Sequence, residues 1–120
     1  PNHYIQYKMK RKKRSDRNHL IYKISLKSMV YIGVTVVENR NPQYSAKRRW
    51  QKHVSRALTE GKGWKLCAAI RKHGSENFLV EVVEVLRGKE PAHKRERQLI
   101  RDLRPSLNTD VRAKKVASGA

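Results

Sequence analysis

Two short segments rich in β-branched and aromatic residues restrict the fold of this chain more than any other feature. They run from His19 to Leu26 and from Met29 to Val37, and only the polar Lys27-Ser28 separates them. Segments of this composition on either side of a short polar linker are typical of a β-hairpin. We therefore expect a fold built around a pair of antiparallel strands.

The hairpin is expected to bring two tyrosines to one face of the sheet. If Ser25–Ser28 form the turn, Tyr22 lies directly opposite Tyr31, and opposed side chains have Cβ atoms about 4.5–5.5 Å apart. Both phenols would then reach one bound group, and Gly33, further along the same face, would leave space for a backbone phosphate. The alternative is an ordinary cross-strand packing pair.

Three helices and a third strand are expected after the hairpin. They are a helix from Ser45 as N-cap to about Thr59, a helix from Trp64 to Lys72 that ends at Gly74, a strand from Phe78 to Leu86, and a last helix with Pro91 in its first turn that stops before Pro105. The order β-β-α-α-β-α predicts an α+β fold, with a small, mainly antiparallel three-stranded sheet flanked by helices. We divide the chain into a basic flexible arm (residues 1–18), one folded domain (19–110) and a basic flexible tail (111–120).

The chain carries 29 Lys and Arg against 10 Asp and Glu, a net charge of +19 on 120 residues. Each basic side chain that neutralises a phosphate releases a condensed counterion, so we expect nucleic acid as the partner. The side chains expected to contact DNA are Lys10, Arg11, Lys12, Lys13 and Arg14 in the arm, and Lys23, Arg48 and Lys52 in the domain. Composition alone favours a non-catalytic binding protein of ribosomal or architectural type.

Membrane and export functions do not fit the sequence. No apolar run reaches the roughly 20 residues of a membrane span, and the N-terminus lacks the apolar stretch of a secretory signal. The single cysteine, Cys67, fits a reducing compartment. We expect an intracellular protein of the cytoplasm, nucleoid or nucleus, with no membrane partner and no small-molecule cofactor.

A glutamate interrupts the apolar stripe of the last helix. Glu96 falls on the stripe formed by Ala92, Leu99, Ile100 and Leu103. Burying an unpaired charge costs several kcal/mol, so Glu96 requires a cation. That cation is either an arginine such as Arg49 or a metal, and a lone carboxylate with waters and phosphate oxygens suits Mg²⁺.

The first long helix places a cation and an imidazole one turn apart. Arg49 and His53 stand at i and i+4 beside an apolar stripe of Trp50, Val54, Ala57 and Leu58. An arginine offers a planar fork of donors that matches a phosphate. The alternative is a solvated basic helix, because Arg48 and Lys52 are close by.

Together these motifs resemble the GIY-YIG endonuclease family over about residues 19–110. The resemblance rests on Leu20-Ile21-Tyr22, Val30-Tyr31-Ile32-Gly33, Arg49-Trp50 with His53, Ala69-Ile70-Arg71-Lys72-His73-Gly74, Glu96, and Asn108 after Pro105. The stretch Lys72-His73-Gly74 is most similar to the homing-type and phage branch. Leu20 departs from the pattern, because the family name requires glycine there.

The resemblance implies a nuclease that hydrolyses DNA phosphodiesters to a 5′-phosphate and a 3′-hydroxyl with one divalent metal, Mg²⁺ or Mn²⁺. Glu96 would be the metal ligand, Tyr22 and Tyr31 the motif tyrosines, and Arg49 the phosphate-binding arginine. The remaining roles are those of His53 as a proton relay and of Asn108 and Gly33 as support residues.

In the mechanism that follows, Tyr22 takes a proton from the attacking water while Tyr31 orients it, and Arg49 stabilises the added negative charge. Ionisation of the Tyr22 phenol would need help from cations, namely Arg49, Lys23 and the metal. The rival hypotheses are the non-catalytic binder and an inactive member of the family. Target preference and oligomeric state are not encoded in any motif of the sequence.

Overall fold

The computed structural model describes residues 16–61 and 63–108. The arm residues Lys10, Arg11, Lys12, Lys13 and Arg14 and the tail 111–120 lie outside the described residues, so the roles expected for them stay predictions. Within the described part no helix combines the length and apolarity needed to cross a bilayer.

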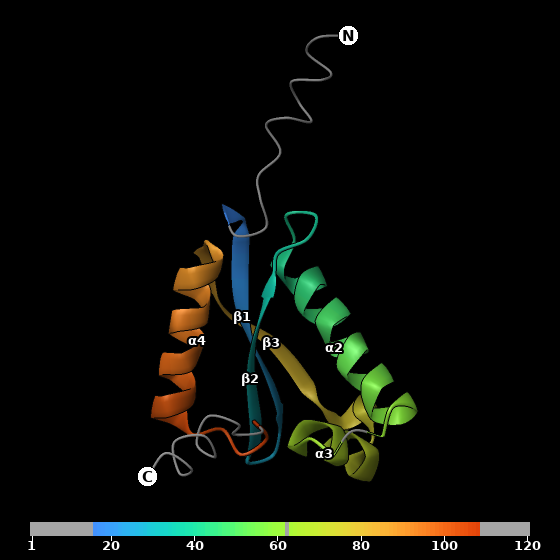
Figure 1. Cartoon of the computed structure of the whole chain (residues 1–120). Coiled ribbons are helices and arrows are strands. Elements are labelled where there is room, and N and C mark those ends of the chain that lie inside the picture. The colour runs from blue at the N-terminus through green and yellow to red at the C-terminus, as the bar shows by residue number, and fades with distance from the viewer. Residues whose placement is uncertain (1–15, 62, 109–120) are drawn as a thin grey trace, which may run out of the picture.

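A three-stranded antiparallel sheet with helices on both faces forms the domain (Figure 1). In chain order the elements are β1 (Asn18–Leu26), β2 (Met29–Val36), α2 (Pro42–Thr59), α3 (Lys65–His73), the 3₁₀ turn η2 (Ser75–Asn77), β3 (Leu79–Arg87) and α4 (Lys89–Leu103). The predicted α+β class and the order β-β-α-α-β-α are confirmed. The strand order is β2-β1-β3, so β1 is central.

The turn of the hairpin is shorter than expected, and this corrects the predicted register. Leu26 pairs with Met29, so only Lys27 and Ser28 form the loop, with Lys27 at a φ of 55°. Tyr22 consequently lies opposite Gly33 rather than opposite Tyr31. The shift is two residues, an even number, so both phenols remain on the same face of the sheet.

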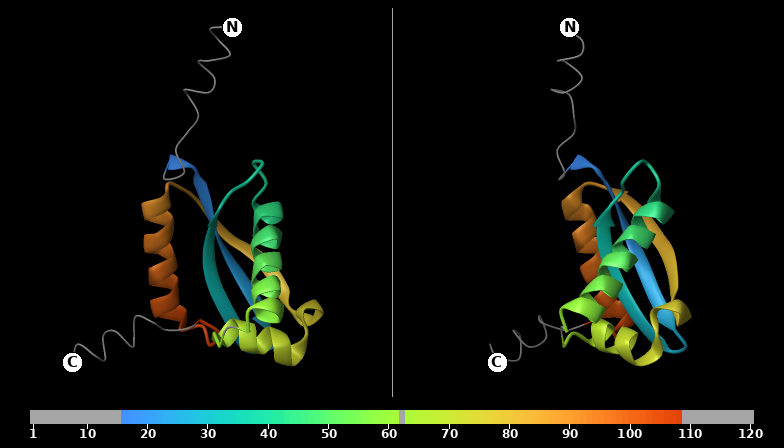
Figure 2. Two further views of the ribbon diagram at one scale, coloured as in Figure 1. Left: turned by 45° about the vertical axis from the view of Figure 1, so that its right-hand side comes forward. Right: turned by 90° about the vertical axis from the view of Figure 1, so that its right-hand side faces the viewer.

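The two faces of the sheet are covered by different helices: α2 and α3 pack on one and α4 on the other (Figures 1 and 2). Leu20, Tyr22 and Ile24 point towards α2 and α3 and belong to the main core cluster. Because side chains alternate along a strand, Ile21 points to the α4 face, where Ala92 is also fully buried. Tyr22 is therefore part of the hydrophobic core.

The first long helix begins earlier than predicted. Asn41 is its N-cap, since its Oδ1 accepts a hydrogen bond from the Tyr44 amide at 3.0 Å, and Pro42 is the first helical residue. Ser45, which we expected to cap the helix, lies inside it and is 1% exposed. Its hydroxyl instead bonds the carbonyl of Asn41 at 2.8 Å and accepts from the amide of Glu38.

Two leucines assigned to the core from the sequence are exposed. Leu58 is 67% exposed because the buried stripe of α2 runs through Ala46, His53 and Ala57, which turns the next residue outward. Leu103 is 59% exposed at the end of α4, and Leu107 in the following loop is buried in its place.

The other boundaries are close to those expected. Gly74 caps α3 at a φ of 85°, as predicted, and Pro91 lies in the first turn of α4. Asn18 already belongs to β1, and the Arg17 carbonyl accepts a hydrogen bond from the Gly88 amide at 2.9 Å. The last residues assigned to the arm are thus part of the fold.

Candidate active site

A hydrogen bond between a tyrosine and a histidine lies at the centre of the candidate site. The Tyr22 hydroxyl of β1 is 2.8 Å from Nε2 of His53 on α2. Both side chains are buried, at 1% and 5% exposure. The sequence placed His53 at the border of its helix, but the structure places it within the buried stripe, where the phenol satisfies its ring nitrogen.

Tyr31 on β2 completes a cluster of three rings. Its ring centroid is 5.2 Å from that of His53, with the planes at 71°, and 6.1 Å from that of Tyr22. The three side chains come from three elements, β1, β2 and α2. The sequence prediction that both phenols share one site is therefore consistent with their positions, although they are diagonal neighbours.

The space above Gly33 is filled by the phenols. A Cβ atom on Gly33 would lie 2.5 Å from Cζ of Tyr22 and 2.9 Å from Cε2 of Tyr31. The gap that we expected to admit a phosphate is therefore occupied by protein. Gly33 supports the site by allowing the Tyr22 ring to pack closely against β2.

The surroundings of Tyr22 keep its hydroxyl neutral. Burial raises the pKa of Tyr22 far above its ordinary value, and the neighbouring Tyr31 raises it further, whereas the charge of Arg49 and its hydrogen bond lower it. Lys23, expected to assist ionisation, is the next residue along β1 and so points to the other face, 3.5 Å from Glu81. Burial thus outweighs the cations, contrary to the expected help for ionisation.

Tyr31 is less buried than Tyr22. Burial is also the largest cause that raises the pKa of Tyr31, while its hydrogen bond with Tyr22 lowers that pKa and the charge of Glu96 raises it. Glu96 therefore acts on Tyr31 from α4, on the other side of β2.

His53 is held in its neutral form. Burial lowers the pKa of His53 to about 4, and the charges of Arg49 and Arg56 lower it in addition. At neutral pH the ring therefore has an unprotonated nitrogen. Offsetting the two arginine charges would make the ring a better proton acceptor, while burial would still oppose its protonation.

Arg49 brings an unsatisfied donor into the cluster. Its side chain is half-buried, and its Nε is buried without a hydrogen-bond acceptor in the described part of the chain. Buried donors almost always have a partner, so this one requires an explanation. A guanidinium with an unused N–H beside a proton-accepting pair is suited to an oxyanion such as a phosphate.

Glu96 lies on α4 with 17% of its side chain exposed, 3.8 Å from Nδ1 of His93 one turn earlier. Its charge acts on Tyr31 from the helix on the other face of the sheet, and its expected role as the metal ligand stays a prediction. Within the described residues no group of three or more His, Cys, Asp or Glu side chains could hold a metal. A single carboxylate, with water and phosphate oxygens as the other ligands, fits Mg²⁺ and does not fit a metal that needs several protein ligands.

Asn108, at the end of the described part of the domain, is hydrogen-bonded to β2, the strand that carries Tyr31. Its amide nitrogen donates to the Ile32 carbonyl at 2.8 Å, and its Oδ1 accepts from the Ile32 amide at 2.9 Å. Ile32 stands between Tyr31 and Gly33, so Asn108 holds β2 where the phenols pack. Its expected place as a support residue near the site agrees with this geometry.

The basic residues expected to contact DNA lie apart from the buried cluster. Arg48 pairs with Glu38 at 3.5 Å and stacks over the Tyr44 ring, and Lys52 is exposed on the outer side of α2. Lys23 is on the α4 face of the sheet. Their contacts with DNA stay predictions.

Sequence reasoning missed two residues next to the cluster, Arg56 and Trp64. The guanidinium carbon of Arg56 lies 6.0 Å from the centroid of the Trp64 ring. The spacing offered a signal, because Arg56 follows Arg49 by two helical turns on the same helix. Trp64 was assigned only to the start of a helix.

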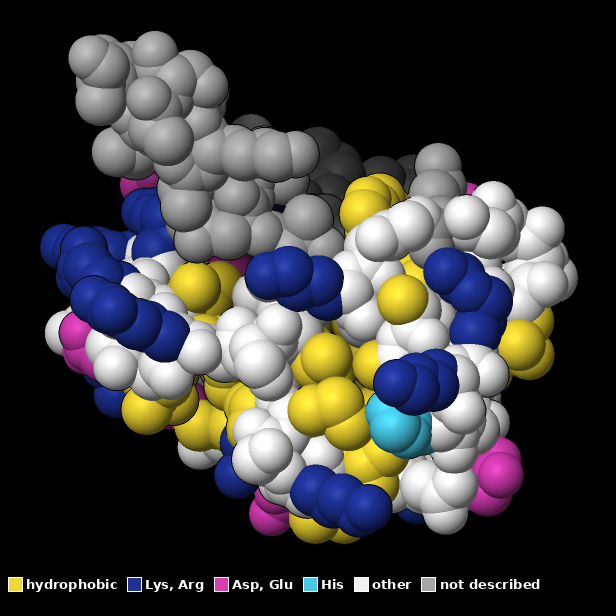
Figure 3. Space-filling model, turned by 90° about the horizontal axis from the view of Figure 1, so that it is seen from below, with side chains coloured by type: hydrophobic (Ala, Val, Ile, Leu, Met, Phe, Trp, Pro, Cys, Tyr) yellow, Lys and Arg dark blue, Asp and Glu magenta, His cyan; other side chains and the backbone are white. Residues whose placement is uncertain are grey.

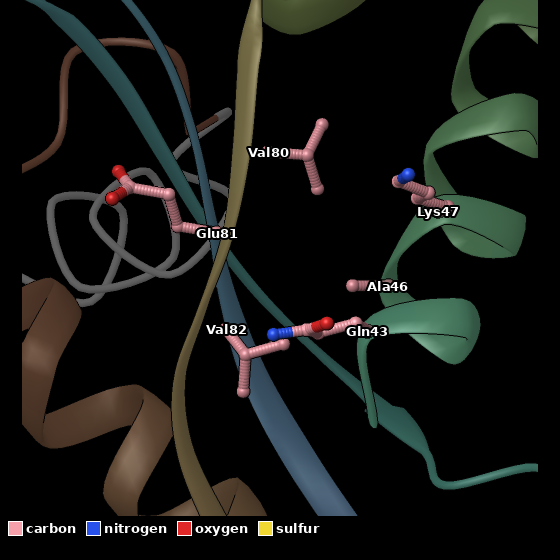
Figure 4. Close-up of a pocket in the computed structure, with 6 residues that line it drawn as sticks. All are labelled: Gln43, Ala46, Lys47, Val80, Glu81 and Val82. Carbon is pink, nitrogen blue, oxygen red and sulfur yellow. The ribbon is translucent and has the colours of Figure 1, made fainter. Parts of the chain in front are cut away.

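A pocket of about 330 Å³ lies elsewhere, between α2 and β3 (Figure 4). Val80 and Val82 point into it from β3, Gln43, Ala46 and Lys47 line it from α2, and Glu81 points away on the far side of the strand. None of the clustered side chains lines this pocket. We therefore place the candidate site at the tyrosine–histidine pair, where the titratable side chains and the Arg49 guanidinium lie together.

Comparisons with known proteins yield no match to a protein-family model, a curated protein or a solved structure. The assignment of function thus depends on the sequence motifs and on this geometry.

Proposed function

We propose that the protein is a metal-dependent DNA endonuclease of the GIY-YIG type, which hydrolyses phosphodiesters to a 5′-phosphate and a 3′-hydroxyl. The observation that carries this proposal is the buried Arg49 Nε, which has no acceptor among the described residues and lies beside the Tyr22–His53 pair. An anion at that point would satisfy the donor. The net charge of +19 makes a nucleic-acid phosphate the favoured anion.

Arg49 binds the phosphate and stabilises the transition state. The guanidinium is fixed by its place on α2 and by its interaction with Tyr22. A donor held in position before the reaction stabilises the charge that develops on the phosphoryl oxygens without further reorganisation. This role requires the fork of an arginine, which a lysine does not supply.

The phenols and His53 carry the proton. Tyr22 is too buried to ionise in advance, so it serves best as the middle of a relay. It accepts a proton from the attacking water, directly or through Tyr31, while its own proton passes to Nε2 of His53. The hydroxide so formed attacks phosphorus, the bond to the 3′ oxygen breaks, and that oxygen takes a proton from solvent water. His53 then releases the proton that it received to solvent, which restores the starting state.

Phosphate binding prepares His53 for this step. In the free protein, Arg49 and Arg56 contribute to the low pKa of His53. Burial is the largest cause of this low pKa, and a phosphate bound to the two arginines offsets only their part of it, so the pKa of His53 rises but stays below its ordinary value of about 6.5. The proton acceptor is thus strengthened when substrate is present.

Glu96 is the residue that would hold the metal. Its carboxylate is mostly shielded from water and its charge acts on Tyr31, and a cation bound to it would lower the free energy of this buried charge. Mg²⁺ or Mn²⁺ at this carboxylate would supply positive charge to the phosphate and to the leaving oxygen.

The test compares Glu96→Gln with Glu90→Gln, an exposed glutamate on the same helix. We expect Glu96→Gln to lower Mg²⁺- or Mn²⁺-dependent cleavage at least about a thousandfold, a loss typical of removing one essential electrostatic group. Glu90→Gln should cleave like the unmutated chain, and both variants should bind DNA with unchanged salt dependence. Linear, nicked and branched DNA serve as substrates.

A chain that binds all of these DNAs but cleaves none of them with either metal would overturn the nuclease proposal. The protein would then be a non-catalytic basic DNA-binding protein, the rival that its charge supports. Cleavage retained in Glu96→Gln would instead remove Glu96 from the mechanism.

A further inference from the structure

A large aromatic side chain is exposed between α2 and α3. Trp64 is 42% exposed, whereas the chain's other tryptophan, Trp50, packs against Phe78 with ring centroids 5.4 Å apart. Trp64 is the N-cap residue of α3 with an extended backbone, and it makes no side-chain capping bond. Capping therefore does not explain why a tryptophan occupies this position.

Trp64 is connected to the candidate site through Arg56. The Arg56 guanidinium carbon lies 6.0 Å from the Trp64 ring centroid, a cation–π distance. Arg56 follows His53 by three residues on α2, about 4.5 Å along the helix axis, and its charge lowers the pKa of His53. Arg49, His53, Arg56 and Trp64 thus form a row that leads from the core of the site to the surface.

The chemistry of this row fits a nucleotide. The guanidinium groups match phosphates, and an exposed indole offers a flat surface on which a base can stack. Basic side chains also stand around exposed apolar surface on the face seen from below, with the acidic ones towards its margin (Figure 3). Such a combination of cations and aromatic surface is typical of binding to single-stranded nucleic acid.

The spacing places the stacked base further along the strand than the nucleotide at the reacting phosphate. Arg56 lies seven residues after Arg49, about 10.5 Å along the helix axis, and the Trp64 ring centroid is a further 6.0 Å from the Arg56 guanidinium carbon, so the indole lies more than one nucleotide from a phosphate on Arg49. Bases inside a duplex are already stacked on each other and do not present a face to an indole. Away from the ends of a duplex, only an unpaired or displaced base can stack on Trp64.

We propose that Trp64 and Arg56 form a stacking platform for an unpaired DNA base a few nucleotides from the scissile phosphate, so that the favoured substrate is DNA with unpaired nucleotides near the cut. The reference to a scissile phosphate rests on the proposed nuclease function. The stacking itself does not, because it requires only that DNA be bound.

The first experiment measures binding without metal. Tryptophan fluorescence is recorded while the full chain is titrated with oligo-dT and with a blunt duplex of equal length. We expect oligo-dT to quench a part of the emission that is missing in Trp64→Phe. The blunt duplex should cause little of this quenching.

The second experiment uses variants and a gapped duplex that has two unpaired nucleotides. Trp64→Ala should weaken binding to the gapped DNA about fivefold to a hundredfold, the range for loss of one stacked base. Binding to the blunt duplex should change by less than about twofold. Trp64→Phe should retain most of the affinity, and Leu58→Ala, which removes another exposed apolar side chain near the end of α2, should have no effect.

Equal loss on both DNAs, or no loss on either, would overturn the proposal, as would tenfold tighter binding of oligo-rU than of oligo-dT. The absence of Trp64 quenching in the unmutated chain would overturn it without any variant. Trp64 quenching by a chain that cleaves no DNA would support the platform and contradict the nuclease function. If instead the chain cleaves DNA and its preference for gapped DNA is the same in Trp64→Ala, the nuclease function would be supported and the platform contradicted.

Discussion

His53 belongs at once to the hydrophobic core and to the candidate site. Its ring lies in the buried stripe of α2, and its Nε2 bonds the Tyr22 hydroxyl at 2.8 Å. Burial keeps the ring neutral, and two arginines reinforce this. A residue in this position couples the protonation of the site to the stability of the fold.

Stability should therefore fall in acid, and His53 should account for part of the loss. In the folded chain His53 stays neutral down to its pKa of about 4, whereas in the unfolded chain it takes up a proton near its ordinary pKa of about 6.5. Between these values the unfolded chain binds more protons, so the free energy of unfolding decreases as the pH falls, by about 3 kcal/mol from this group.

Urea unfolding at several pH values between about 7 and 4 tests this expectation in the unmutated chain and in His53→Gln. Glutamine keeps a hydrogen-bonding partner for Tyr22 but does not titrate. The variant should lose less stability over this interval. If the free energy of unfolding changes with pH in the same way in both proteins, the pKa of His53 would be the same in the folded and the unfolded chain, contrary to the prediction.

Much of the candidate site could be predicted one residue at a time. The choice of Tyr22, Tyr31, Arg49, His53 and Glu96 comes from their spacing together with the family resemblance. The structure brings Tyr22, Tyr31, Arg49 and His53 together, and the charge of Glu96 acts on Tyr31 from α4. Burial could not be predicted in this way, because it depends on which helix face packs on the sheet. The sequence analysis therefore expects the neighbouring cations to help Tyr22 ionise. In the structure, burial has a larger effect on the pKa of Tyr22 than Arg49 has, and it raises that pKa.

At the scale of elements, the strands and helices followed from composition and turn residues, but the register of the hairpin did not. A two-residue loop usually requires glycine or asparagine, and Lys27-Ser28 contains neither. Lys27 nevertheless adopts a φ of 55°. The close packing of Tyr22 on Gly33 across the hairpin is consistent with this register, and no local pattern reveals that contact.

Replacing Gly33 should therefore damage both the fold and the site. A Cβ atom at this position would overlap the Tyr22 and Tyr31 rings and push the Tyr22 hydroxyl away from His53. We expect Gly33→Ala to lower the free energy of unfolding by about 1–3 kcal/mol, as overpacking commonly does. Chemical denaturation measures this change.

Gly63→Ala is the matched control, because a Cβ there meets nothing within 4 Å and the backbone does not require glycine. Its stability should be unchanged or raised by up to about 1 kcal/mol. Equal stability of both variants would show that the Tyr22 ring moves aside without cost.

At the scale of the whole molecule, charge should determine how strongly the protein binds DNA. On α2 the basic residues Arg48, Lys52 and Arg56 follow each other at four-residue spacing next to Arg49 and His53. They form a basic stripe along one side of the helix. A DNA backbone that reaches Arg49 would pass along this stripe.

Binding should weaken linearly on a logarithmic salt scale, and Lys52→Ala should reduce the slope by about 1, the value expected for one lost phosphate contact. The exposed Lys89, at the start of α4, provides the control, and Lys89→Ala should leave the slope unchanged. Fluorescence anisotropy with labelled DNA over a series of salt concentrations gives both slopes. Identical slopes for the two variants would place the DNA path away from α2.

The two hydrogen bonds between the Asn108 side chain and the backbone of Ile32 also influence how two copies of the protein can associate. An outer strand with unpaired backbone groups invites a strand of another molecule to extend the sheet. In β2 those groups are occupied at Ile32 by the Asn108 side chain and at Val30 by the Leu107 amide, 2.8 Å from the Val30 carbonyl. Sheet extension between two copies is therefore disfavoured at β2 beside the phenols, and β3 is the edge left for it, so that an assembled form would still keep the candidate site uncovered.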